Sequence, residues 1–178
     1  MKIYKSIIGA IATLVVGGGV YSVRQADVVN NFAANTGMTQ EQAQKYVSGI
    51  DQSSLTTFDK VGASLVSDGN LANDEASKID CENYQYEWET KTLTCIEGKR
   101  QLSAVGQGEI TLGKVYEKLN SDSATKDTMT EAINDIDALS SLYKSEVIKV
   151  MLDVAAINDI TQTNAYNKSI LQAAIQGK

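Results

Sequence analysis

The clearest pattern of apolar and polar positions lies in the C-terminal third of the chain. Apolar residues recur there at every third or fourth position, at Met129, Ile133, Ile136, Leu139, Tyr143, Val147, Val150, Val154 and Ile157. This spacing places them along one face of an α-helix. Because one helix of that length is unusual in a compact domain, we expect a break near Ser140–Ser141 or within residues 158–164. The stripe is expected to form the core of a helical bundle or, alternatively, a coiled-coil or assembly interface.

Shorter amphipathic segments precede this stripe. Helices are predicted over residues 25–35, 40–50, about 55–66 and 109–119, each with apolar side chains on one face. Thr39 and Gln42 fit a capping box at the start of the second of these helices. Asp68–Gly69–Asn70 is expected to end the third, and a further helix is expected to begin at Asn73. Residues 25–178 are therefore predicted to form a single, mainly helical domain.

The segment between the two cysteines has a different period. Tyr84, Tyr86 and Trp88 alternate with polar residues, which is typical of a strand with one aromatic face. We predict a β-hairpin over about residues 84–96, inserted into the helical domain at 81–100. A lone hairpin is marginally stable in water, so its aromatic face is expected to pack on helices. The three aromatic residues are also candidate interaction residues.

Cys81 and Cys95 are the chain's two cysteines and have 13 residues between them. A disulfide closing a loop of this size would stabilise the fold by about 3 kcal/mol in the chain-entropy model. The alternative is a pair of buried thiols. The disulfide is favoured because the N-terminus indicates an oxidising compartment.

The N-terminus has the character of a targeting segment. Lys2 and Lys5 precede an apolar run over residues 7–23, and no further charge occurs before Arg24. Residues 1–24 are therefore predicted to be a signal anchor or a signal peptide, with residues 6–23 as an apolar helix contacting the membrane and the body exported. The anchored form places the body in the periplasm or the extracellular space. A cleaved and secreted form is the alternative.

Composition narrows the possible chemistry. The net charge is −6 and there is no histidine. Without histidine, serine–histidine and cysteine–histidine catalysis is excluded, and the commonest general base and metal ligand is missing. The negative charge and the lack of a basic cluster argue against nucleic-acid binding. We predict no enzymatic activity and no cofactor.

One segment partly resembles a calcium-binding loop. Asp68 and Glu75 have the spacing of the fifth and twelfth positions of an EF-hand loop, and Asn70 would supply a backbone carbonyl between them. Ser64 and Val66 stand at the first and third positions, where the loop needs strong ligands. An ordinary turn between two helices is the favoured interpretation, and Asp68, Asn70 and Glu75 remain weak metal candidates.

Taken together, these patterns predict a helical bundle with one small β-hairpin and an N-terminal apolar helix. The predicted function is a non-enzymatic structural or interaction component of an exported cell-envelope or secretion assembly, with protein partners that include further copies of itself. The alternatives are a membrane-associated structural protein of a virion or phage, and a small ligand- or calcium-binding module.

Overall fold

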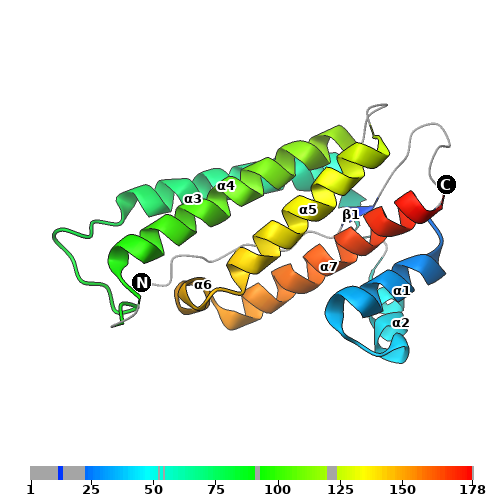
Figure 1. Ribbon diagram of the computed structural model, residues 1–178, viewed down its shortest axis with the longest axis horizontal. Coiled ribbons are helices and arrows are strands. Elements are labelled where there is room, and N and C mark those ends of the chain that lie inside the picture. Colours follow the sequence, from blue (N-terminus) through cyan, green and yellow to red (C-terminus); the bar gives the residue numbers. More distant parts are fainter. Residues whose placement is uncertain are drawn as a thin grey trace.

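The computed structural model describes residues 12–13, 23–51, 53, 55–90, 93–119 and 124–177. It is mainly helical, as predicted (Figure 1). The helices are α1 (Gln25–Thr36), α2 (Gln40–Gly49), α3 (Phe58–Lys78), α4 (Cys95–Leu119), α5 (Lys126–Tyr143), α6 (Glu146–Met151) and α7 (Val154–Gln176). Two short strands, β1 (Ala12–Thr13) and β2 (Thr56–Thr57), pair in parallel.

The long helices α3 and α4 form an antiparallel hairpin held at unusually close range (Figure 1). Glycines face each other along it at seven-residue spacing, Gly62 and Gly69 against Gly113 and Gly106. A Cβ atom built on Gly62 would lie 2.5 Å from the Gly113 carbonyl oxygen, and one built on Gly106 would lie 2.6 Å from the Gly69 carbonyl oxygen. Only residues without a side chain allow the two backbones to approach this closely.

The remaining long helices complete the bundle. α5 packs on α4 and α7, and α1 packs on the other side of α7 (Figure 1). The main core lies between these helices and contains the fully buried side chains Phe32, Phe58, Leu112, Tyr116, Met129, Ile136, Leu139 and Leu171. The capping box at Thr39 and Gln42 is confirmed and begins α2.

The predicted stripe is confirmed in part. Met129, Ile136, Leu139 and Tyr143 are buried on α5, but the helix breaks at Lys144–Ser145 and at Leu152–Asp153 rather than at the predicted places. The side chains of Ser145 and Asp153 accept the backbone N–H groups of Ile148 and Ala155, so each residue starts a new helix. These turns rotate the stripe and leave Val150 and Val154 exposed.

The predicted turn at Asp68–Gly69–Asn70 is wrong, because α3 runs through it to Lys78. A glycine normally weakens a helix interior by up to about 1 kcal/mol relative to alanine. Here Gly69 is buried against Gly106 on α4, and the packing of the two helices outweighs that preference.

The predicted β-hairpin at 84–96 is also wrong within the described residues. Residues 84–90 are turns and irregular chain, and Cys95 and Ile96 belong to the first turn of α4. The Thr94 hydroxyl accepts the Glu97 N–H and its carbonyl accepts the Gly98 N–H, so the helix begins where the second strand was expected. Just before it, the Thr90 N–H donates a hydrogen bond to the Leu93 carbonyl.

The predicted apolar helix at residues 6–23 lies mostly outside the described residues. Ala12 and Thr13, which are described, form a strand with Thr56 and Thr57, so the prediction of helix is wrong at these two positions. Among the described helices, none is both long enough and apolar enough to cross a membrane.

Candidate functional site

The disulfide between Cys81 and Cys95 is confirmed. It joins the segment just after α3 to the first residue of α4, with the two Cα atoms 5.6 Å apart. It therefore clamps the end of the α3–α4 hairpin where the connecting loop joins the two helices. We call residues 79–98 and 145–154 the disulfide end, because α6 packs beside the start of α4 there.

The three aromatic candidates in this loop have different positions. Trp88 is buried over Gly98, and its ring lies 5.3 Å from the Tyr86 ring in a stacked arrangement. The Tyr86 hydroxyl accepts the Asp80 N–H at 2.9 Å. Tyr84 is 68% exposed. Trp88 and Tyr86 therefore belong to a small core under the loop, and Tyr84 alone of the three presents its side chain to solvent.

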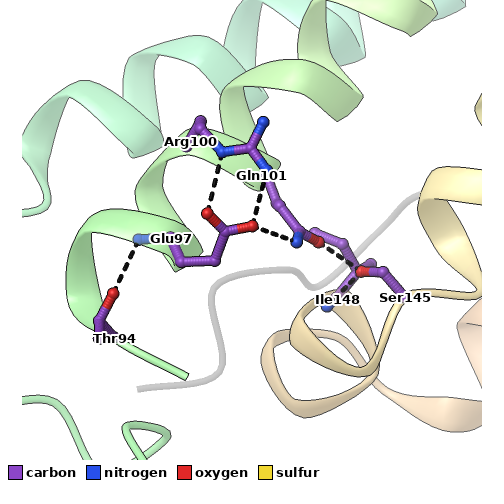
Figure 2. A network of polar contacts seen from close by, with 6 residues as sticks. All are labelled: Thr94, Glu97, Arg100, Gln101, Ser145 and Ile148. Atoms are coloured by element: carbon purple, nitrogen blue, oxygen red, sulfur yellow. Dashed lines mark hydrogen bonds and ion pairs between the residues drawn. The ribbon is translucent and has the colours of Figure 1, made fainter. Parts of the chain in front are cut away.

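A network of polar side chains ties α4 to α6 (Figure 2). Glu97 accepts hydrogen bonds from Arg100 and from the Gln101 amide at 2.6–2.9 Å. The Gln101 amide oxygen in turn accepts the Ser145 hydroxyl at 2.5 Å. The bonds from Arg100 and Gln101 lower the pKa of Glu97 to about 2. Because Ser145 is also the N-cap of α6, the network fixes where α6 begins.

Exposed apolar side chains gather at this end. Tyr84, Ile96, Val150 and Val154 are 68%, 72%, 51% and 62% exposed. They come from the loop, the start of α4, α6 and the start of α7. Sequence analysis placed Val150 and Val154 in a stripe expected to form the bundle core or, alternatively, an assembly interface. In the described part of the chain, Leu71 on α3 is the other large apolar residue with comparable exposure.

The loop at the disulfide end is acidic. Residues 80–90 include Asp80, Glu82, Glu87 and Glu89 and no lysine or arginine. Asp80 bonds to Asn83 and Glu89 accepts the Tyr86 N–H, so these two carboxylates shape the loop. Glu82 and Glu87 are exposed and give its surface a negative charge.

The weak metal candidates do not form a calcium loop. Asp68, Asn70 and Glu75 all lie on α3, where the chain is helical rather than wrapped around a centre. Asn70 is exposed, and Glu75 forms an ion pair with Lys78 at 2.8 Å. Within the described ranges, no group of three or more Cys, Asp or Glu side chains is placed to hold a metal ion.

One buried carboxyl group was missed by sequence analysis. Glu109 on α4 is fully buried, its Oε1 atom accepts the Tyr143 hydroxyl from α5, and its Oε2 atom has no hydrogen-bond partner. A signal for it exists in the sequence, because position 109 falls at alternating three- and four-residue spacing within a buried stripe. The other members of that stripe are Leu102, Val105, Leu112, Tyr116 and Leu119.

A groove of about 700 Å³ lies against α2. α2 is at the other end of the bundle from α6 (Figure 1). Its lining residues come from α2 and the turns that flank it: Met38, Gln42, Lys45, Tyr46, Gly49, Ile50 and Asp51. Met38, Tyr46 and Ile50 give it an apolar floor, while Lys45 and Asp51 are exposed at its rim.

Comparison with protein-family models, with curated proteins and with solved structures finds no match to this chain.

Proposed function

We propose that this chain is a non-enzymatic interaction component of an exported assembly and that it binds a protein partner through the disulfide end. The observation that carries the proposal is the group of exposed apolar side chains, Tyr84, Ile96, Val150 and Val154, on segments that meet there. Exposed apolar surface of this kind is a common mark of a protein–protein contact.

The disulfide end is also held in one arrangement before any partner binds. The Cys81–Cys95 bond fixes the loop to α4, and the Glu97–Gln101–Ser145 network fixes α6 to the same helix. A surface that is ordered in advance loses less conformational entropy on binding. The loop, the start of α4 and α6 can therefore present their exposed apolar side chains to a partner from a rigid frame.

The charge of the loop favours one kind of partner. Glu82 and Glu87 are exposed in this loop, and residues 80–94 carry four acidic residues against one cation, Lys91. A complementary partner would surround an apolar socket with lysine or arginine, because opposite charges speed association and disfavour wrong partners. The disulfide supports an oxidising compartment, which agrees with the targeting character of the N-terminus.

Site-specific photo-cross-linking in the producing cell tests this proposal. A photoreactive residue is placed at Ile96 or at Val150, and in a matched control at Leu71, which is 55% exposed on α3 away from the disulfide end. We expect a discrete cross-linked protein from Ile96 and Val150 and none from Leu71. Reversing the loop charge with Glu82→Lys and Glu87→Lys should reduce the yield at Ile96 several-fold.

Equal cross-linking at all three positions, or none at Ile96 and Val150, would refute docking at this end. The export half of the proposal is tested separately with an alkaline phosphatase fusion after the last residue, which is active only outside the cytoplasm. An inactive fusion would refute the exported location without bearing on the docking surface.

A further inference from the structure

The most unusual group in the core is the Glu109 carboxyl. It lies in the middle of α4, between the apolar side chains of Val105 and Leu112 on the same buried face. The Tyr143 hydroxyl donates to Oε1, while Oε2 is buried without a partner. Leaving a buried polar atom unpaired is unfavourable, and leaving a buried charge unpaired is far more so.

Two neighbouring helices, α5 and α3, contribute the groups that act on this carboxyl. Tyr143 comes from α5, and the half-buried Asp68 comes from α3, where the Ser64 hydroxyl lies 3.5 Å from its carboxylate. The charged residues of α6, Glu146 and Lys149, are exposed and pair with each other at 2.7 Å. No cation pairs with Glu109 among the ion pairs of the described residues. An ionised Glu109 would therefore face a like charge and have one hydrogen-bond donor for two oxygens.

We propose that Glu109 is a proton-operated latch: when neutral it allows α5 to close on α4, and when ionised it loosens the corner between α5 and α6. The ionised carboxylate needs a second donor that the packed helices do not supply, so α5 must shift to admit water to Oε2. The consequence for docking, which rests on the proposed function, is that partner binding weakens as the pH rises.

The chain connects the latch directly to the disulfide end. Tyr143 is the last residue of α5, and Ser145, two residues later, is the N-cap of α6 that bonds to Gln101. α6 carries the exposed Val150. A displacement at Tyr143 therefore moves the start of the helix that presents part of the docking surface.

Glu109 changes its charge near neutral pH. Burial raises the pKa of Glu109 from its ordinary value of 4.5 to about 7; the Tyr143 hydrogen bond opposes this rise and the charge of Asp68 adds to it. As the pH rises from 4.5, the unfolded chain loses this proton first, so the folded state becomes less stable until the pH passes about 7. The folding equilibrium constant should fall by a factor of about 10² to 10³ across this window.

Carbon-13 NMR of the glutamate carboxyl groups in the isolated chain tests the latch. We expect one carboxyl to titrate near pH 7, and its signal to be absent in Glu109→Gln. Two further variants should move this pKa in opposite directions. Asp68→Asn removes the repelling charge and should lower the pKa, whereas Tyr143→Phe removes the bond to the carboxylate and should raise it. These opposed shifts test the surroundings of the carboxyl, whereas a purely structural role for Glu109 predicts docking that does not change with pH.

Docking is measured as a separate readout by repeating the Ile96 cross-link at pH 6 and pH 8. We expect a lower yield at pH 8 in the wild type and no pH dependence in Glu109→Gln. A Glu109 pKa at or below 5, or opposed shifts that fail to occur, would overturn the latch even if docking at the disulfide end is correct. If Glu109 titrates near pH 7 as expected but the cross-linking yield is the same at pH 6 and pH 8, the titration is not coupled to docking.

Discussion

The α3–α4 hairpin and the α1–α7 interface join their helices in different ways. In the hairpin, glycines let the two backbones touch, and a disulfide closes the end. Between α1 and α7, amide side chains bridge the helices: Asn35 donates to the Ser169 hydroxyl and to the Gln172 amide oxygen, both at 3.0 Å. Close backbone packing and a covalent bond thus hold α3 to α4, whereas hydrogen bonds between side chains help to hold α1 to α7.

This difference affects how each interface responds to change. Close backbone packing has no room to adjust, so a single added methyl group must displace a whole helix. A hydrogen bond near the surface contributes only about 1 kcal/mol net, because water can replace the lost partner. α7 nevertheless buries several polar residues, Thr163, Asn164, Asn167 and Ser169, which give its contacts direction as well as energy.

The largest expected effect comes from opening the hairpin. The double variant Cys81→Ser/Cys95→Ser should lower the free energy of unfolding by about 3 kcal/mol, because the unfolded chain gains the freedom that the closed loop removes. Denaturant unfolding measures this change. Hydrogen exchange should become faster first in residues 79–98, while α7 stays protected.

This prediction separates the two regions. Equally faster exchange in the hairpin and in α7 would show that the two regions unfold as one unit. The two interfaces would then not differ in local stability. Unchanged stability would mean that the loop is ordered by Trp88 and Tyr86 without help from the disulfide.

The next effect comes from the glycine contact. Gly69→Ala should cost about 2–3 kcal/mol, because its Cβ would lie 2.8 Å from the Ile110 side chain and still closer to the Gly106 carbonyl oxygen. The matched control is Gly49→Ala at the end of α2, where nothing lies within 4 Å of the added atom. The control should be neutral or stabilising by up to about 1 kcal/mol, because alanine favours helix. The melting temperatures of both variants are compared with that of the wild type. Equal changes would show that close helix packing does not require glycine at position 69.

The helical parts of the fold were predictable because local signals and tertiary packing agree there. The Thr39–Gln42 capping box and the apolar positions of α5 have short-range causes that the sequence displays. The disulfide was predictable because only two cysteines exist and their spacing allows a loop. Gly69 was misread because its decisive partner, Gly106, lies far away in the sequence. The aromatic run was misread because Trp88 packs on Gly98 of α4, a contact that alternation along the chain does not display.

The candidate site was only partly predictable for the same reason. The alternation of Tyr84, Tyr86 and Trp88 predicted a strand with all three on one packed face. The structure instead has irregular chain there, with Trp88 buried, Tyr86 half-buried and Tyr84 exposed. Val150 and Val154 fit the helical stripe, and only the new helix starts at Ser145 and Asp153 turn them outward. Glu109 required attention to the one polar residue in an apolar stripe.

The smallest expected effect lies at the α1–α7 interface. Asn35→Ala removes two hydrogen bonds to α7, and Asn30→Ala changes an exposed position on the same helix. Both variants gain the better helix propensity of alanine, so that contribution cancels when they are compared. We expect Asn35→Ala to be less stable than Asn30→Ala by about 1 kcal/mol in denaturant unfolding. A difference near zero would show that water replaces the amide without loss, leaving the apolar contacts of Phe32 and Ala33 to hold α1 in place. A difference as large as that for Gly69→Ala would contradict the distinction between the two interfaces. Hydrogen bonds would then fix α1 on α7 as firmly as close packing fixes α3 on α4.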